Sequence, residues 1–410
     1  MSSRISDEAR LPMTLRPDVE LLALDGDWVL FSEQAQCLIR LNESAAFVVR
    51  QLQSGTPSGE LARALIAAGI APAGEAEQWA ADTLQGLGSH GVLEGTPLPQ
   101  PPTTVGYLEE SHRRIRAAMP PLAPFSTMVE QRYRLLGTCA LVRFAFRSQK
   151  RLVDAAIGHL ATDEACTPTL VIDIPGVQEG LNTASNVYRD GSPYGYAPQH
   201  AHLAPLVKAA LWESAVSAHD FLLYVHAGVV GTRDGCILLP ARPGSGKSSL
   251  TAALVHRGFR YYSDEVALVE PATFRVPPVP LAICVKSTGW DLMARYYPHI
   301  EDLPPHRRSD DKLVRYIAPP TGAARWPSLP VSHIIFPRFD PNAANELVRI
   351  PRADALGRVM EECLALSRRL NRQNVAELIR WIEAVDCYAL TFQSLDEAAE
   401  LVTQLAQSPA

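Results

Sequence analysis

The sequence of 410 residues has few lysines, no closely paired cysteines and no long apolar run. Its seven cysteines include no CxxC pair, so neither a disulfide framework nor a cysteine zinc site is expected. No run of about 18 apolar residues occurs, so no membrane-spanning helix is predicted. The first residues, MSSRISDEAR, are polar and mixed in charge, unlike a signal peptide, and we expect a cytoplasmic protein.

Charge is also limited, at 20% of residues against 47% apolar ones, which predicts packed cores in two or three domains. The net charge of −6 gives no reason to expect nucleic acid. Only five of the 38 basic residues are lysines. Three of these lie at positions 247, 286 and 312, and each is a candidate for a role that arginine cannot fill.

Residues 19–95 have the pattern of a small α+β domain that follows a flexible tail at 1–18. A hairpin over 20–31 turns at Asp25-Gly26, and a strand over 37–41 follows. Asn42 is placed to cap the first of three helices, at 43–52, from 56 and at 75–88. This order predicts a winged-helix-like module. Residues 1–100 carry 13 acidic residues and six arginines, so DNA is not the expected partner, and a docking or dimerisation module is the alternative.

The order of these elements resembles the PqqD-type peptide-recognition domain, through Leu41-Asn42-Glu43-Ser44 and the closing Gly91-Val92-Leu93. The resemblance implies that the leader of a ribosomally made precursor peptide is the partner. The leader would add as a strand beside the third strand, in a groove against the third helix. The implied groove residues are Cys37, Leu38, Ile39, Arg40, Leu41 and Trp79.

A proline-rich stretch, TPLPQPPTT, opens a linker that we place at 96–124, and the second domain is expected over 125–410. Strands are predicted at 137–146, 169–174, 221–230 and 235–241 and helices at 152–160 and 203–218, with loops over 175–204. The expected fold class is therefore α/β with a mixed sheet.

A glycine-rich loop, Arg242-Pro-Gly-Ser-Gly-Lys-Ser-Ser249, follows the strand 235–241 and begins a helix that is expected to end near Gly258. Glycines let backbone N–H groups turn toward phosphate oxygens, and the helix N-terminus adds partial positive charge. The alternative is a glycine-rich turn without a ligand. The residues predicted to bind nucleotide phosphates are Gly244, Ser245, Gly246, Lys247, Ser248 and Ser249.

An acidic pair, Asp264-Glu265, follows Lys247 by 17 residues. A phosphate loop needs a carboxylate to complete the Mg²⁺ shell, and transfer to an alcohol benefits from a carboxylate that accepts its proton. Two adjacent acids can divide these tasks, with the Ser248 hydroxyl as a further metal ligand. The alternative interpretation is a surface turn.

The stretch from His226 to Pro271 resembles the HPr kinase/phosphorylase family, within the phosphoenolpyruvate-carboxykinase-like P-loop fold. The resemblance implies that His226 lies by the phosphates, that Asp264 is the catalytic base or acid, and that Glu265 is a metal ligand. Ala241 replaces the first loop glycine, and Glu265 replaces a second aspartate. The glycine-rich C-terminal signature of HPr kinases is missing, so the chain more resembles the HPr-kinase-like proteins of peptide-modification clusters.

Further cations are weaker candidates. Lys286, Lys312 and Arg315 are predicted to contact phosphate or a substrate carboxylate, with solvated side chains as the alternative. His200 and His202 lack a third ligand for a metal. The segment 306–312 is expected to be a mobile surface loop that can close over substrate.

These observations predict a kinase that uses ATP and Mg²⁺ to phosphorylate a hydroxyl, Ser foremost, of a precursor peptide held by its N-terminal domain. Three alternatives stay open: a kinase of a carrier protein or small metabolite, a non-catalytic nucleotide-binding scaffold that recruits other peptide-maturation enzymes, and an ATPase coupled to cyclisation. Neither nucleic acid nor a membrane is an expected partner, and a homo-oligomer is left open.

Overall fold

The structure is a computed structural model that describes residues 13–98, 116–176, 184–365 and 370–407. Contacts divide the chain into two compact units. The first combines Met1–Pro102 with Ile350–Glu361 and Arg368–Ala384, and the second contains Thr103–Arg349, Glu362–Ser367 and Val385–Ala410. The second domain therefore differs from the continuous stretch expected over 125–410, because two C-terminal segments pack with the N-terminal region. Most of the expected linker lies outside the described residues.

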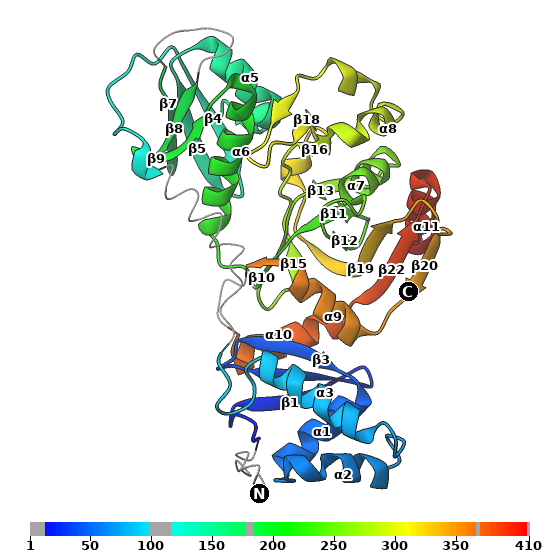
Figure 1. The fold of residues 1–410 in the computed structure, drawn as a ribbon. Helices are drawn as coiled ribbons and strands as arrows, with labels where there is room; N and C mark the ends of the chain where they lie inside the picture. The colour runs from blue at the N-terminus through cyan, green and yellow to red at the C-terminus, as the bar shows by residue number, and fades with distance from the viewer. Residues whose placement is uncertain (1–12, 99–115, 177–183, 366–369, 408–410) are drawn as a thin grey trace, which may run out of the picture. The chain divides into compact units, whose positions relative to one another are not determined.

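The first unit contains an antiparallel sheet in the order β1-β2-β3 (Figure 1). Its strands are β1 (Val19–Leu24), β2 (Asp27–Ser32) and β3 (Cys37–Leu41). The predicted hairpin is confirmed, since Asp25 and Gly26 have φ of 52° and 84° at the two-residue turn.

Three helices follow, as predicted: α1 (Glu43–Gln53), α2 (Leu61–Ala67) and α3 (Ala76–Ser89). The Asn42 side chain caps α1 by accepting a hydrogen bond of 2.9 Å from the Ala45 N–H. Buried Leu30 and Leu41 of the sheet pack in one apolar core with the helices. This core leaves the opposite face of the sheet to be covered.

Helices from the C-terminal part of the chain contact the sheet on that side. Val29 and Phe31 alternate with Leu30, so they point to the opposite face, and both are buried. Helix α9 (Arg352–Glu361) contacts β2 and β3, and α10 (Arg372–Glu383) contacts α9. Three ion pairs join these helices to the sheet: Arg352–Asp25 at 3.2 Å, Arg40–Asp354 at 3.5 Å and Arg372–Glu20. The first unit is thus completed by residues more than 300 positions away in the sequence.

The flexible tail predicted at 1–18 is wrong for its last residues. Leu15 pairs with Leu93, and the Arg16 N–H donates to the Val92 carbonyl at 3.0 Å. Asp18 accepts from the Ser32 hydroxyl at 2.8 Å. These residues belong to the first unit because their backbone is paired, whereas 1–12 lie outside the described residues.

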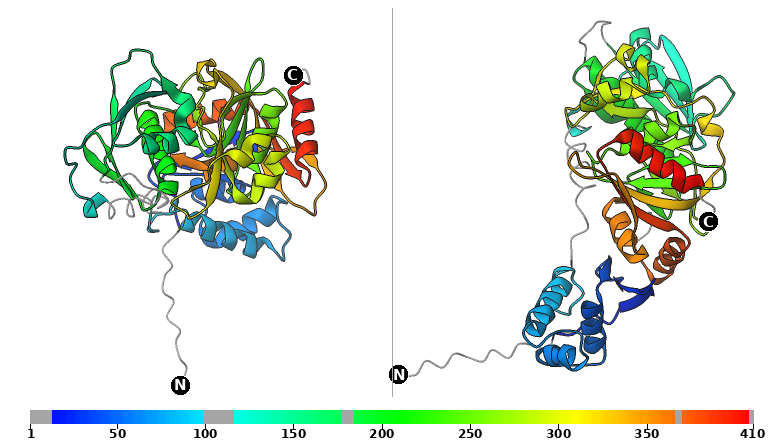
Figure 2. Two further views of the ribbon diagram at one scale, coloured as in Figure 1. Left: turned by 90° about the horizontal axis from the view of Figure 1, so that it is seen from above. Right: turned by 90° about the vertical axis from the view of Figure 1, so that its right-hand side faces the viewer.

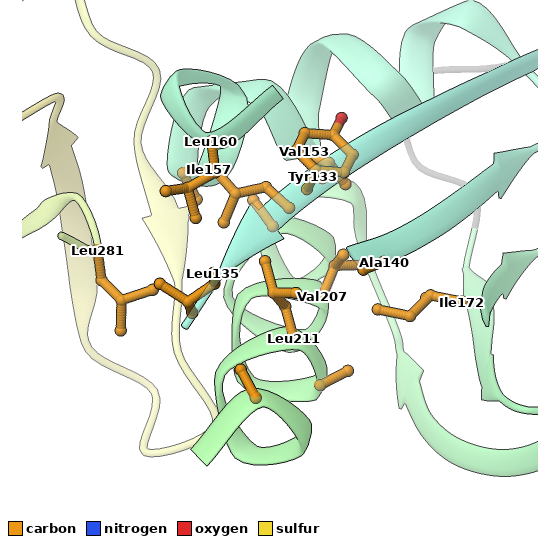
Figure 3. Close-up of a cluster of buried hydrophobic side chains, with 14 of the residues drawn as sticks. Tyr133, Leu135, Ala140, Val153, Ile157, Leu160, Ile172, Val207, Leu211 and Leu281 are labelled. Carbon is orange, nitrogen blue, oxygen red and sulfur yellow. The ribbon is translucent and has the colours of Figure 1, made fainter. Parts of the chain in front are cut away.

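The second unit begins with a six-stranded sheet in the order β6-β4-β5-β7-β8-β9. The strands are β4 (Val129–Leu135), β5 (Thr138–Phe144), β6 (Ala161–Thr162), β7 (Leu170–Ile174), β8 (Ser185–Arg189) and β9 (Ser192–Ala197). Figure 3 shows side chains of this sheet, such as Tyr133 and Ile172, with Val153 of α5 (Arg147–Ile157) and Val207 of α6 (His200–Ser217). This cluster fixes α6 against the sheet.

Two expectations fail in this region. The segment 175–204 is not made of loops throughout, because β8, β9 and the start of α6 lie within it. A disulfide joins Cys139 to Cys166, with 6.3 Å between their Cα atoms, although none was expected. The two cysteines are 27 residues apart, so only the meeting of β5 with the segment before β7 brings them together.

A seven-stranded mixed sheet follows, with the path β13-β11-β12-β19-β22-β20 and β15 paired to β19. The strands are β11 (Ala227–Gly231), β12 (Cys236–Pro240), β13 (Arg260–Ser263), β15 (Arg275–Val276), β19 (Leu329–Phe339), β20 (Glu346–Arg349) and β22 (Asp386–Phe392). β19 pairs in parallel with β12 and β22, and the other pairs are antiparallel. Helices α7 (Lys247–His256) and α11 (Leu395–Gln407) lie side by side against this sheet (Figures 1 and 2). The coarse prediction of an α/β fold with mixed sheets is confirmed.

Two small sheets complete the unit. One has the order β14-β10-β21, from β14 (Ala267–Val269), β10 (Leu223–Val225) and β21 (Cys363–Ala365). The other has the order β16-β18-β17, from β16 (Ile283–Lys286), β18 (Leu313–Ile317) and β17 (His306–Arg307), with α8 (Trp290–Ala294) nearby. The single strand predicted at 221–230 is thus two strands, β10 and β11, in different sheets. Within the described ranges, no helix has both the length and the apolar character needed to cross a membrane.

Candidate functional site

The second unit has a cavity of about 830 Å³ at the start of α7. The glycine-rich loop, the turn between β13 and β14, and the sheet β16-β18-β17 all contribute to its lining. Of the predicted site residues, those that line it are His226, Gly244, Gly246, Lys247, Ser248, Ser249, Asp264, Glu265, Lys286 and Lys312. Predicted site residues up to 86 positions apart in the sequence therefore meet in one space.

The glycine-rich loop connects the end of β12 to the first residue of α7. Gly244 and Gly246 have φ of 98° and 85°, in the left-handed region that favours glycine. A Cβ at position 246 would lie 2.7 Å from the Phe392 ring, so only glycine fits there. Ser245 does not line the cavity, since its hydroxyl donates to the Arg242 carbonyl at 2.8 Å.

A close helix–strand contact holds α7 in place behind this loop. A Cβ on Gly228 of β11 would collide with the hydroxyl of Thr251 on α7, and Thr251 is fully buried. The absence of a side chain at position 228 therefore allows the first turn of α7 to lie directly on the sheet. This packing fixes the position of Lys247.

Lys247 is a buried cation without a partner. Only 6% of the residue is exposed, and its Nζ has no hydrogen-bond partner within the described part of the chain. Burial lowers the pKa of Lys247 to about 8, although the nearby Asp264 and Glu265 carboxylates oppose this shift. A buried ammonium without hydrogen bonds is costly, so this position is suited to an anion that supplies them.

Asp264 is buried and is held by a backbone donor. Its Oδ2 accepts from the Cys284 N–H at 2.9 Å, and its Oδ1 lies 3.2 Å from the Tyr261 hydroxyl, whose single proton is shared with the closer Leu281 carbonyl at 2.6 Å. Burial raises the pKa of Asp264, and the Lys208 charge opposes that shift. A carboxylate with a raised pKa is a better proton acceptor than an ordinary one, so Asp264 suits the predicted role of a base.

Glu265 forms an ion pair that sequence reasoning missed. The Lys208 Nζ of α6 lies 2.5 Å from the Glu265 Oε2, and Lys208 is itself 5% exposed. Burial alone raises the pKa of Glu265, but the Lys208 ammonium and its hydrogen bond lower it to about 2. Burial alone lowers the pKa of Lys208, but Glu265 raises it above its ordinary value. Both groups are therefore ionised at neutral pH.

The scarcity of lysine was the signal that could have found Lys208. It is the only charged residue in the apolar stretch LAPLVKAALW, and four of the five lysines lie at this site or beside it. The fifth, Lys150, pairs with Asp154 on α5.

The residues of the cavity are suited to a metal ion that is bound mainly by the phosphates of a ligand, and not to one bound by protein side chains alone. No group of three or more His, Cys, Asp or Glu side chains that could hold a metal occurs among the described residues. Ser248 and Glu265 both line the cavity, and Mg²⁺ bound to nucleotide phosphates requires only one or two protein ligands. Lys208 engages the Glu265 Oε2, and the other carboxylate oxygen is open to such an ion.

His226 lies between β10 and β11 and is neutral. The backbone N–H of His226 donates to the Glu362 carbonyl at 2.9 Å. The ring Nδ1 lies 3.0 Å from the Glu265 carbonyl oxygen. A carbonyl only accepts, so Nδ1 carries the proton and Nε2 is an acceptor. Burial lowers the pKa of His226 to about 4, and Lys247 contributes to this shift. His226 can therefore accept a hydrogen bond in the cavity.

The remaining predicted cations differ in their surroundings. Lys286 and Lys312 line the cavity, whereas Arg315 does not, because its guanidinium stacks over the Trp290 ring at 4.1 Å. The expected mobile loop at 306–312 is instead a β-hairpin. Its turn is closed by backbone hydrogen bonds of 3.0 Å from Arg308 N to Lys312 O and from Asp311 N to Arg308 O.

In the first unit, the six predicted groove residues do not share one surface. β3 is the last strand of its sheet. Cys37, Ile39 and Trp79 are half-buried against the core on the helix side, and Leu41 is buried there. Leu38 and Arg40 point to the opposite face by strand alternation, and Arg40 pairs with Asp27 and with Asp354 of α9. Only the helix side fits the expected groove.

The site thus combines an unpaired buried ammonium, a glycine-rich turn at a helix N-terminus, and a buried carboxylate with a raised pKa. Such a set can bind a polyphosphate and accept a proton beside it. No protein-family model matches the chain, and no curated protein sequence matches it either.

Proposed function

We propose that the second unit is a P-loop kinase similar to HPr kinases, which uses ATP and Mg²⁺. Its acceptor is a hydroxyl, Ser foremost, of a ribosomally made precursor peptide. The first unit is a winged-helix-like domain of PqqD type that holds the leader. The observation that carries the proposal is the Lys247 ammonium, buried without a hydrogen bond at the start of α7. The β- and γ-phosphates of ATP would supply its missing acceptors.

The residues of the loop would bind and orient the nucleotide. Gly244 and Gly246 let backbone N–H groups face the phosphates, and the N-terminus of α7 adds partial positive charge. Lys247 would stabilise the charge that develops on the transferred group. Ser248 and Glu265 would hold Mg²⁺, which neutralises phosphate charge and orients the phosphates when bound.

Asp264 would take the proton of the acceptor. The acceptor oxygen forms a bond to the γ-phosphorus while the bond from that phosphorus to the ADP oxygen breaks, and the hydroxyl proton moves to an Asp264 oxygen. The raised pKa of Asp264 favours this transfer, and the Cys284 N–H holds the carboxylate in place. The neutral His226 would accept a hydrogen bond through Nε2.

The first unit would bind the leader along β3. This strand ends its sheet, and half-buried Cys37, Ile39 and Trp79 form an apolar surface beside it. An extended peptide gains main-chain hydrogen bonds from such an edge and selectivity from side-chain contacts. Holding the leader raises the local concentration of the segment to be phosphorylated.

The test incubates the full chain with ATP, Mg²⁺ and the precursor encoded beside its gene, and follows intact peptide mass. We expect one added phosphoryl group, which is lost in Lys247→Met. Lys150→Met is the matched control, because Lys150 lies on α5 and does not line the cavity. Release of ADP without a phosphorylated peptide would contradict the proposal, as would a product that Lys247→Met leaves unchanged.

A further inference from the structure

Three cations outside the glycine-rich loop lie at one end of the sheet β16-β18-β17. Lys286 is the last residue of β16, Arg308 follows β17, and Lys312 precedes β18. Lys286 and His306 both pair with Val314 of β18, from its two sides. The strand ends therefore bring the three side chains together, and all three line the cavity. We call them the cationic wall.

Among the described residues, one carboxylate, that of Asp310, lies within ion-pair distance of these three positive charges. Asp310 accepts a hydrogen bond of 2.8 Å from Lys312 and lies 3.3 Å from the Arg308 Nε. Lys286 has no ion-pair partner among the described residues. The neighbouring Cys284 thiol adds no negative charge at neutral pH, because burial raises its pKa to about 11. The cationic wall thus keeps an excess of positive charge.

The acidic pair offsets only part of this excess. Glu265 contributes to raising the pKa of Arg308 but is itself engaged by Lys208 at 2.5 Å, and Asp264 accepts a hydrogen bond from the Cys284 N–H. The charge of Lys286 also contributes to lowering the pKa of Lys247, so both ammonium groups act within the same enclosed space. An anion between them would offset this repulsion.

The position of the cationic wall relative to Asp264 indicates which anion it binds. The Cys284 N–H donates to Asp264, and Lys286 lies two residues further along β16. Two strand residues span about 7 Å, and their side chains point to the same face. A peptide whose hydroxyl lies at Asp264 would therefore place a neighbouring side chain at Lys286, while the loop and Lys247 hold the nucleotide phosphates.

We propose, on the basis of the proposed function, that the acceptor segment is acidic and carries a carboxylate one or two residues from its hydroxyl, bound by Lys286, Arg308 and Lys312. The carboxylate is an Asp or Glu side chain of the acceptor rather than its C-terminus. Lys286 contributes most, since Asp310 already offsets part of the charge of the other two.

The experiment measures binding by calorimetry to the full chain loaded with ADP, so it requires no turnover. Three synthetic peptides are compared, each with one serine. The first has two glutamates after the serine and an amidated C-terminus, and the second has two glutamines in their place. The third ends at the serine, whose carboxylate is free. We expect the diglutamate peptide to bind about tenfold more tightly than the glutamine peptide. The third peptide separates a terminal from a side-chain carboxylate.

Lys286→Gln should reduce binding of the diglutamate peptide to the level of the glutamine peptide, and leave ADP affinity unchanged. Lys150→Gln is the matched control, and Lys312→Gln is the second variant if Lys286→Gln does not fold. Equal binding of the acidic and glutamine peptides, no binding of either, or a loss confined to ADP affinity would overturn the inference. A failure of phosphoryl transfer with intact acidic binding would instead contradict the proposed function.

Discussion

The two units differ in the buried groups that they contain. Among the described residues, the buried polar side chains of the first unit are Ser32 and Asn374, and neither is charged. Those of the second unit include Asp173, which pairs with Arg143, and Lys208, Lys247 and Asp264, which lie at or beside the cavity. A buried charge lowers the stability of the fold unless a partner or a ligand compensates it. The buried charges at the cavity therefore destabilise the second unit where a ligand is expected. The buried polar side chains of the first unit carry no charge.

The largest effect should come from the unpaired lysine. Lys247→Met should lower phosphoryl transfer by about 10³-fold, because it removes a cation from the transferring phosphates. The same variant should unfold at a higher temperature without nucleotide, since a buried ammonium is replaced by an apolar chain. Peptide mass and calorimetry measure the two effects. Lower stability together with unchanged transfer would show that Lys247 is a structural residue.

The pH dependence of stability tests the same lysine. Its pKa is lowered from 10.5 to about 8, so the folded protein binds fewer protons than the unfolded chain between these values. The destabilisation is fully present below about pH 8 and is relieved as pH rises toward 10.5. The free energy of unfolding of wild type relative to Lys247→Met should therefore increase across this window. A difference that does not change with pH would contradict the burial of an ionised Lys247.

The buried ion pair should give the next largest effect. Lys208→Met leaves Glu265 without its partner and should destabilise the second unit by about 2 kcal/mol. This is below the value for fully buried pairs, because 27% of the Glu265 side chain is exposed. Lys208→Met/Glu265→Gln should recover most of the loss in chemical denaturation. No recovery would show that Lys208 acts through apolar packing.

Acid titration provides a second measurement of this pair. The pKa of Glu265 is lowered from 4.5 to about 2, so its contribution to stability is present above about pH 4.5 and is lost as pH falls to 2. Glu265→Gln should lack this part of the acid transition.

Substitution in the apolar surface beside β3, where we expect the leader to bind, should have a moderate effect and leave the cavity of the second unit unchanged. Trp79→Ala should raise KM for the full precursor about tenfold, through loss of an aromatic contact, and leave a leaderless peptide unaffected. Ile66→Ala is the matched control, because Ile66 is an exposed apolar residue on α2 of the same unit. Equal effects on both substrates would contradict leader binding at this surface. Deleting 1–95 is a poorer test, because it would strip α9 and α10 of the sheet that they contact.

The smallest effects should distinguish the two units. Asn42 caps α1 and Asn371 caps α10, each through a hydrogen bond of 2.9 Å to a backbone N–H. Asn42→Ala and Asn371→Ala should each cost about 1 kcal/mol. Both should weaken the same unfolding transition in calorimetry, since α10 belongs to the first unit. A loss from the other transition in Asn371→Ala would contradict this division.

Local chemistry could be predicted from the sequence where a short segment decides its own conformation. The turn at Asp25-Gly26, the cap at Asn42 and the loop before α7 follow from residues within a few positions of one another. The segment 175–204 was misread because its Gly, Pro and Tyr content is typical of loops, although β8 and β9 pair there. The sequence offers Arg315 as a possible contact for phosphate or a carboxylate, but strand alternation turns its side chain toward Trp290.

The glycine-rich loop, its lysine and the acidic pair could be predicted from the sequence, because backbone geometry and helix polarity act over a few residues. Tertiary structure decided which lysines serve the site. Lys208 and Glu265 are 57 residues apart and meet only because α6 packs beside the turn after β13. Tertiary structure also decided that α9 and α10 complete the first unit. An apolar helix face can pack against any apolar surface that buries it, so the local sequence does not specify which surface that is.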